Sequence, residues 1–226
     1  GPAEPVRYPV SHLASYGVGL LFDNLFMVGR SETPHFSATV DDGFTLIQLT
    51  ASDATITGPN GGWYTLTPAA TPNVITIDAT IKSSGDFTGD GTEESPYLIG
   101  STADWTKLYL DLATGENTYT GKVFRLTHDI DCGGISVGTD EHPFSGTFDG
   151  DGHTLTLNVG SEYNPSDVAK APFYRVSEAT FRHLHTAGKV CTSAPYTGGI
   201  IGQVMGGSGR GRLYDCHSSM NIHSPL

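Results

Sequence analysis

The sequence predicts an all-β protein in which a small β-sandwich-like module is followed by a short solenoid with one helix at its start. Short runs rich in Val, Ile, Thr and aromatic residues alternate with Gly-containing turns along most of the chain. Residues 213–218 repeat the pattern of residues 181–186, and internal repeats of a few tens of residues are typical of solenoids. Residues 101–114 have the apolar spacing of an amphipathic helix.

The N-terminal module is predicted over residues 1–82. Residues 1–15 contain three prolines and are expected to form an extended lead-in. Turns such as residues 41–43 and 58–62 then separate short strand-like runs, which are residues 17–22, 36–40, 44–50, 54–57, 63–67 and 74–80. Strands of this length joined by tight turns predict a small antiparallel set of the sandwich type.

The second module is predicted over residues 83–226, after the polar, Gly-containing segment 83–86. Its helix is expected to begin at Ser101, which suits an N-cap with Asp104 three residues later, and to end before Gly115. The apolar stripe of that helix has i, i+3, i+4, i+7 spacing and consists of Trp105, Leu108, Tyr109 and Leu112. A helix at this place is expected to cover the apolar end and the unpaired strand edges of the first coil.

The repeat fixes a register between two coils. Aligning its two units places Phe181 over Leu213 and Val176 over Val204. The second unit is therefore longer by four positions, which fall in the Gly-rich turn 206–211, where stacked coils tolerate insertions. The same alignment points Leu184 and Cys216 inward, and it places Cys191 over His223. No disulfide between Cys191 and Cys216 is therefore expected.

Several motifs of the second module resemble a known family. Residues 95–99, 121–131 and 144–154 resemble the leading segment of bacterial surface proteins that carry the GLUG repeat, and residues 197–202 are similar to the repeat itself. The resemblance covers about residues 86–222 and implies a right-handed parallel β-helix, secretion and a role in adhesion. Tyr174 and Arg175 depart from it, because they stand where a glycine-containing turn is usual. Residues 42–44, 64–69 and 73–77 resemble, more weakly, a small β-repeat module of bacterial cell-surface proteins.

Composition limits the classes of partner. The formal net charge is −12, whereas a protein that binds nucleic acid needs a surplus of Lys and Arg, so nucleic acid is excluded as a partner. The chain has no apolar run near the ~20 residues of a transmembrane helix, so no transmembrane span is expected. The sequence starts at Gly1 rather than Met, which suggests that a targeting segment has been removed. The expected location is the cell surface or the exterior, with any anchor outside this sequence.

Two places could hold a metal ion. Asp86 and Asp90 resemble the opening of a calcium loop, although Tyr97 stands at the twelfth position where such loops have Glu; a solvated linker turn is the alternative. The repeat register also stacks a polar column one coil apart, at about 4.8 Å. Its residues are candidates for a transition-metal site or simply for a solvated ladder: His183, His185, Asp215 and His217.

Tyrosines near turns and strand ends are the candidate ligand-binding residues. Exposed aromatic rings on a regular β-face suit stacking on sugars or docking of a protein, and the alternative is that they cover coil edges. The tyrosines in such places are Tyr119, Tyr163, Tyr174, Tyr196 and Tyr214, of which Tyr174, Tyr196 and Tyr214 are chosen as the candidate site.

The function predicted from these observations is non-catalytic. A rigid solenoid face would recognise a carbohydrate or protein ligand at the cell surface, in the manner of an adhesin. A carbohydrate-active enzyme of the polysaccharide lyase or hydrolase type, using the same face, is one alternative, and a structural spacer is another. The sequence has no HExxH, and the Asp149-Gly150-Asp151 segment is better explained by a tight turn than by an acid–base pair. The last coil is expected to self-associate or to end in a disordered tail.

Overall fold

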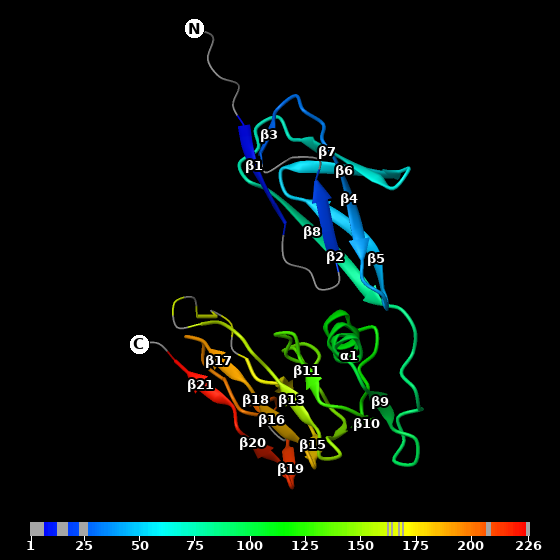
Figure 1. Cartoon of the computed structure of the whole chain (residues 1–226), viewed down its shortest axis with the longest axis vertical. Helices are drawn as coiled ribbons and strands as arrows, with labels where there is room; N and C mark the ends of the chain where they lie inside the picture. Colours follow the sequence, from blue (N-terminus) through cyan, green and yellow to red (C-terminus); the bar gives the residue numbers. More distant parts are fainter. Residues whose placement is uncertain are drawn as a thin grey trace. The chain divides into compact units, whose positions relative to one another are not determined.

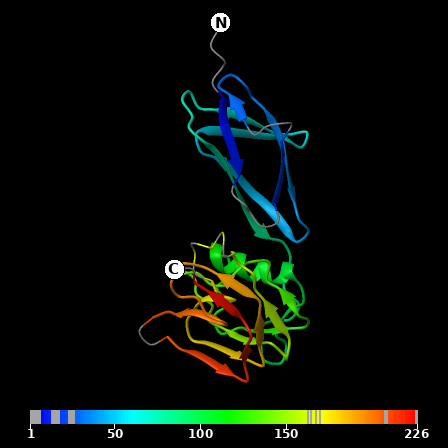
Figure 2. The same ribbon diagram turned by 60° about the vertical axis from the view of Figure 1, so that its left-hand side comes forward.

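The computed structural model describes residues 7–12, 18–22, 27–161, 163, 165–166, 168, 170–206 and 209–224. The chain divides into two compact units, Gly1–Ser84 and Gly85–Leu226, which are drawn in Figures 1 and 2. Strands dominate both units, and one α-helix occurs among the described residues, in agreement with the predicted all-β class.

The first unit contains two four-stranded sheets. One has the order β3 (Met27–Gly29), β1 (Arg7–His12), β8 (Ile75–Ser83) and β5 (Phe44–Ala51). The other has the order β2 (Val18–Phe22), β4 (His35–Val40), β7 (Trp63–Pro68) and β6 (Ala54–Asn60). Both sheets contribute to one buried cluster, which consists of Val28, Phe36, Leu66, Ile75 and Ile77.

The prediction that residues 1–15 form an unpaired lead-in is wrong for residues 7–12. Residues 7–12 form β1, which pairs antiparallel with β3 and parallel with β8. Val10 lies opposite Ile75 in the parallel pair, so the set is mixed rather than purely antiparallel. The reason is long-range: β1 is the first strand of the unit and β8 is the last, and local pattern does not encode a contact between them.

The strands of the second unit lie in four parallel sheets. The largest has the order β9 (Tyr97–Ile99), β10 (Val123–Leu126), β12 (Thr147–Asp149), β15 (Ala179–Arg182) and β19 (Gly211–Tyr214). A second has the order β11 (Ile130–Asp131), β13 (Thr154–Thr156), β16 (His185–Ala187) and β20 (His217–Ser218). Two pairs complete the set, β14 (Phe173–Val176) with β18 (Ile201–Val204) and β17 (Lys189–Cys191) with β21 (Asn221–His223).

The register of these sheets confirms the predicted alignment of the repeat. Phe181 lies opposite Leu213. Val176 lies opposite Val204, and Cys191 lies opposite His223. The difference in length between the two repeat units is therefore absorbed between β18 and β19, as the Gly-rich turn predicted. Leu184 is fully buried as expected, whereas Cys216 is only partly buried against the core.

Helix α1 (Thr102–Thr114) is the predicted helix. The Ser101 side chain accepts a hydrogen bond from the Asp104 backbone N–H at 3.1 Å, and Gly115 ends the helix with a left-handed φ of 71°. Thr102 donates to the carbonyl of Asp131, and the Trp105 indole donates to the carbonyl of Ile135 at 3.1 Å. The helix therefore lies beside β11, the first strand of its sheet, and covers that end of the unit (Figure 1).

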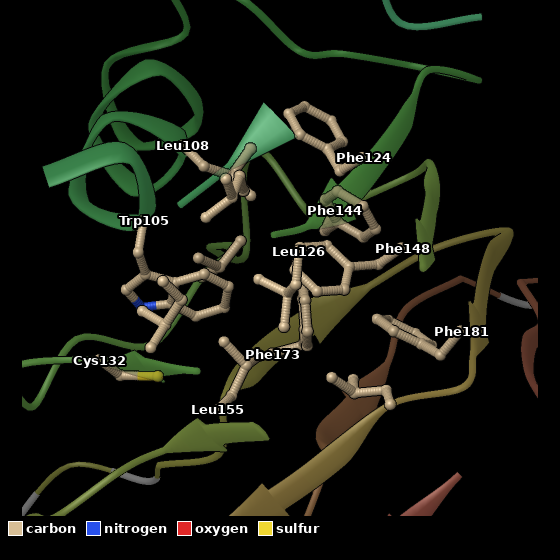
Figure 3. Packing of buried hydrophobic residues seen from close by; sticks show 14 of the residues in the cluster. Trp105, Leu108, Phe124, Leu126, Cys132, Phe144, Phe148, Leu155, Phe173 and Phe181 are labelled. Atoms are coloured by element: carbon tan, nitrogen blue, oxygen red, sulfur yellow. The ribbon is translucent and has the colours of Figure 1, made fainter. Parts of the chain in front are cut away.

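The core of the second unit is rich in aromatic rings that contact one another (Figure 3). The ring centroids of Phe173 and Phe181 are 4.6 Å apart, and those of Phe148 and Phe173 are 4.9 Å apart. Trp105 of α1 meets Phe173 edge-on at 5.3 Å. Each such pair adds about 0.5–1.5 kcal/mol to the burial of its surface, so these ring contacts link α1 with strands β12, β14 and β15.

The two ends of the second unit differ. At the first end, α1 covers β11, and the Leu98 backbone N–H of β9 is bonded to the carbonyl of Thr88. At the other end, β18, β19, β20 and β21 each pair on one side only within the described residues. Large apolar side chains are exposed on these strands, namely Val204, Leu213, Tyr214 and Ile222, which are 38%, 46%, 57% and 44% exposed.

Candidate functional site

The structure brings two of the three predicted tyrosines together around Arg175. The guanidinium carbon Cζ lies 3.7 Å from the ring centroid of Tyr174 and 5.4 Å from that of Tyr196. Tyr174 is half-buried and Tyr196 is 53% exposed. Tyr214 belongs to β19, in another sheet, where it lies opposite Arg182. The Arg175 cluster, defined as Tyr174, Arg175, Tyr196 and Asp140, is therefore the candidate site.

Strand β14 presents this cluster between two backbone bridges. Val137 and Phe144 pair with Phe173 and Val176 respectively, so residues 138–143 leave the ladder and return to it beside Arg175. Gly138 makes this departure possible, because it has a φ of 88° and a Cβ at this place would lie 2.1 Å from the Arg175 carbonyl oxygen. The short loop carries Asp140 to the guanidinium.

The guanidinium of Arg175 is buried and only partly satisfied. Its side chain is 7% exposed, and Nε donates to the carboxylate of Asp140, which is 71% exposed. Nη1 is buried and has no hydrogen-bond acceptor among the described residues. A buried donor without an acceptor costs about 1–3 kcal/mol. The stacking of the cation on Tyr174 offsets part of that cost, since desolvated cation–π contacts contribute about 2 kcal/mol.

Gly202 of β18 holds the two tyrosines close. A Cβ at this position would lie 2.7 Å from the carbonyl oxygens of both Tyr174 and Tyr196, and 3.3 Å from the Tyr174 ring. Tyr196 itself has a left-handed φ of 63°, an uncommon conformation for a residue other than glycine. The glycine of the motif 197–202 thus allows the segment with Tyr196 to approach β14, which places an exposed ring next to the buried cation.

Asp149, a candidate acid in the sequence, is instead the centre of an ionic network. Its carboxylate accepts hydrogen bonds from Arg182 Nε at 2.9 Å and from the Asp151 backbone N–H at 3.0 Å, and it contacts His183 Nδ1 at 3.1 Å. Burial by itself raises the pKa of Asp149, but these hydrogen bonds outweigh it and hold the pKa below its ordinary value. The group therefore stays ionised and is occupied by its partners.

The two histidines of the predicted column that lie on strands, His185 and His217, are neighbours in the structure. His185 lies opposite His217 in the parallel pair of β16 and β20, and their ring centroids are 6.0 Å apart. His183 and Asp215 occupy equivalent corners with φ of 48° and 50°, and the His183 ring contacts Asp149. Over the part of the chain that the structure describes, no group of three or more His, Cys, Asp or Glu residues is arranged to hold a metal ion.

In the candidate calcium loop, the carboxylate of Asp90 is bonded to a residue of the same segment. One oxygen of the Asp90 carboxylate accepts hydrogen bonds from the Thr92 N–H and hydroxyl at 3.0 and 2.7 Å. These bonds lower the pKa of Asp90. The ammonium of Lys122 donates to the Asp90 carbonyl at 3.0 Å. Asp90 therefore serves a turn, which agrees with the alternative reading of this segment, and Asp86 is not bonded to that turn by any of these contacts.

One of the other two tyrosines, Tyr119, has a different role from the one that its position near a turn suggested. Tyr119 is 5% exposed, and its hydroxyl donates to Asp111 at 2.6 Å. Burial and that carboxylate raise its pKa. Tyr163, in contrast, is 98% exposed. Sequence reasoning also missed the contribution of Asp140. The available signal was Arg175 itself, a cation in an otherwise apolar and aromatic strand, which requires an anion somewhere in the fold.

Comparison with known proteins shows a similarity to halomucin. Over 207 aligned residues the chain is 28% identical to halomucin of Haloquadratum walsbyi (strain DSM 16790 / HBSQ001), a match that covers 78% of this chain. The match covers 2% of the length of halomucin. No protein-family model matches the sequence, and no solved structure matches it. Within the described residues, none of the helical structure is long and apolar enough to cross a membrane.

Proposed function

We propose that this chain is a non-catalytic recognition module of a cell-surface protein, and that it binds carbohydrate at the Arg175 cluster. The observation that carries the proposal is the approach of Arg175 to the rings of Tyr174 and Tyr196, at 3.7 and 5.4 Å. Sugar rings stack on aromatic faces, and a neighbouring guanidinium supplies hydrogen-bond donors to their oxygens. The exposed ring of Tyr196 could therefore stack on a sugar while Arg175 donates hydrogen bonds to the oxygens of that sugar.

We further infer the architecture that presents this site. The first unit is a β-sandwich, and the second is a short right-handed parallel β-helix related to the GLUG-repeat proteins. The shared core of two four-stranded sheets supports the first assignment. The in-order parallel ladders, whose partners come from successive repeat units, support the second. Such a stack presents side chains on a rigid scaffold, so a ligand loses little free energy to ordering of the protein.

A location outside the cell, at its surface, is part of the proposal. The similarity to halomucin supports it, and so does the resemblance of several motifs to bacterial surface proteins. The acidic net charge of −12 suits a solvated surface protein better than one that docks on an anionic membrane. The proposal concerns this segment, which corresponds to a small part of its relative.

The contacts of Asp149 argue against the alternative of a carbohydrate-active enzyme. Asp149 is the most buried of the carboxylates that the sequence offered as acids, and Arg182, His183 and the Asp151 N–H hold it ionised. A general acid needs a pKa raised toward the working pH, and Asp149 has the opposite shift.

A glycan-array screen of the intact chain, with reducing-end detection on the same polysaccharides, tests the proposal. Binding without new reducing ends is the expected result. Tyr196→Ala should weaken binding about three- to tenfold, the loss expected for one stacked ring. Tyr163→Ala is the matched control, since Tyr163 is also an exposed tyrosine but lies outside the cluster. New reducing ends would favour the enzyme, and equal effects of the two variants would remove the cluster from the binding site.

A further inference from the structure

The Arg175 cluster points to the chemistry of the sugar. We propose, as an extension that rests on the proposed function, that the cluster selects carbohydrates carrying an oxyanion, either the carboxylate of a uronic acid or a sulfate ester, over neutral ones. Three features of the site lead to this inference: an unused donor, a solvent-exposed counter-ion, and an exposed ring beside both.

The unused donor is Nη1 of Arg175. It is buried and has no acceptor among the described residues, although the guanidinium around it is held on one side by Asp140 through Nε. A guanidinium presents donors in a fixed planar fork, and its Nη edge matches the two oxygens of a carboxylate or a sulfate. A ligand oxyanion would supply the missing acceptor, whereas a hydroxyl of a neutral sugar would make only an uncharged bond of about half the strength.

The counter-ion in the site is an exposed one. Asp140 is 71% exposed while the Arg175 side chain is 7% exposed, so the pair joins a buried cation to a solvated anion at the tip of the loop 138–143. Ion pairs with one partner in water contribute little, and the carboxylate of Asp140 keeps most of its hydration. The cation is therefore incompletely compensated by its own chain. It retains attraction for a second anion despite the overall negative charge, because that charge is screened beyond about 8–10 Å at moderate salt.

The exposed ring of Tyr196 is the group beside Arg175 that can most easily move aside for a ligand. Nη1 is buried, so a ligand reaches it only if a neighbouring group moves. Tyr174 stacks directly on Cζ at 3.7 Å and is half-buried, whereas Tyr196 is 53% exposed and lies further away at 5.4 Å. A rotation of the Tyr196 side chain would uncover the guanidinium and leave its ring beside the incoming sugar.

Replacing Asp140 by Asn changes the charge of the site but not its shape. In Asp140→Asn the loop keeps its size and one acceptor, but the site loses the anion that competes with the ligand. Affinity for an acidic oligosaccharide should then rise about threefold or more, while affinity for a neutral one stays unchanged. Because the Asn side chain keeps an acceptor for Nε of Arg175, this variant is expected to fold even if Arg175 itself cannot be replaced, and circular dichroism checks that it does. Arg175→Gln should lower affinity for the acidic ligand about tenfold or more.

The experiment is calorimetry of the intact chain with three matched probes: an oligogalacturonate, its methyl ester, and a sulfated galactan oligosaccharide. Preference for the oligogalacturonate over its ester, increased by Asp140→Asn, is the expected result and identifies a carboxylate; the same pattern for the sulfated probe alone identifies a sulfate. Equal binding of the acid, its ester and the sulfated probe, or no effect of Asp140→Asn, would overturn the inference while the proposed sugar recognition stands. No binding of any probe, together with a silent glycan array, would defeat the proposed function itself.

Discussion

The carboxylate of Asp149 accepts a hydrogen bond of 2.9 Å from Nε of Arg182, its direct neighbour in the parallel ladder between β12 and β15. Arg125 of β10 lies on the other side of the same carboxylate, at 3.7 Å. Arg182 is also bonded to Glu93, which precedes β9 in the chain. One buried anion therefore joins the three neighbouring strands β10, β12 and β15, and its removal affects more than one strand pair.

Asp149→Ala should destabilise the second unit by about 1.5–3 kcal/mol, the range for losing hydrogen bonds to a charged group whose partners are partly solvated. The physical reason is that Arg182 and Arg125 would keep their charges without the anion between them. Urea unfolding followed by circular dichroism measures the loss. Glu116→Gln, at an exposed position just after α1, is the control and should change the unfolding free energy by less than about 0.5 kcal/mol. A small effect of Asp149→Ala would show that water replaces the carboxylate.

Stability should fall in acid, and Asp149 should account for part of the fall. Its pKa in the folded chain lies below the value of about 3.9 in an unfolded one. The stabilisation from this shift is complete above the unfolded pKa and is lost as the pH falls through the folded pKa. Unfolding midpoints in urea should therefore decline below about pH 4, and Asp149→Asn should flatten that decline. Parallel curves for the two proteins would assign the acid sensitivity elsewhere, for example to Asp129, whose pKa is lowered by the Thr154 N–H.

Ser101→Ala should cost about 1 kcal/mol, the usual value of an N-cap that loses its side-chain acceptor. Ser101 accepts from the Asp104 N–H at 3.1 Å, and the helix it caps covers β11. Ser101→Asp restores an acceptor and should recover most of the loss. Both variants are read by thermal unfolding. An equal loss in the two variants would mean that the position is sensitive to something other than capping.

The three thiols should react in a fixed order. Cys132 and Cys191 are buried, and burial raises the pKa of the Cys132 thiol, so little thiolate is available there. Cys216 is partly exposed, and its Sγ lies 3.3 Å from the Tyr214 carbonyl oxygen. Mass spectrometry after alkylation of the native protein should show label on Cys216 first, and on all three cysteines only after unfolding in the absence of reductant. Fewer than three labels in the unfolded chain would reveal a disulfide.

The open end of the second unit should promote self-association. Leu213 and Ile222 are exposed on strands that pair on one side only among the described residues. Sedimentation velocity over a range of concentrations should show a reversible oligomer, and Leu213→Ser combined with Ile222→Lys should shift it toward monomer. Ile47→Ser, at an exposed apolar residue of the first unit, is the control. A monomer at every concentration of the unaltered chain would contradict the prediction.

Much of the second unit was predictable because its information is local or repeated. The N-cap at Ser101 and the apolar stripe that begins at Trp105 both lie within the segment that caps and forms α1, so this helix can be located from local sequence. The register followed from comparing two similar segments, since pairing Phe181 with Leu213 needs only their like surroundings. Parallel stacking turns a sequence repeat directly into neighbouring strands, so no long-range search is involved.

The parts that could not be predicted depend on contacts between unlike segments. Nothing in residues 7–12 indicates β8 as a neighbour. Asp140 and Arg175 meet only because the loop 138–143 bulges out between two bridges to β14. Tyr119 was grouped with exposed tyrosines because it lies near a turn, whereas the structure buries it against Phe87 and Phe124 at centroid distances of 5.8 and 5.2 Å. Position in a turn does not by itself set the exposure of a long side chain.

The ladders of the second unit keep their register although their turns differ in length. Val176 pairs with Val204 and Ala179 pairs with Gly211, so the connection after β18 is longer than the one after β14 with no shift in either ladder. Substitutions and insertions in the turns therefore leave the pairing of the strands unchanged. Such a chain can diversify its surface quickly over evolution while its stacked interior changes slowly, and an epitope or fluorophore inserted after β18 would leave the remaining rungs in place.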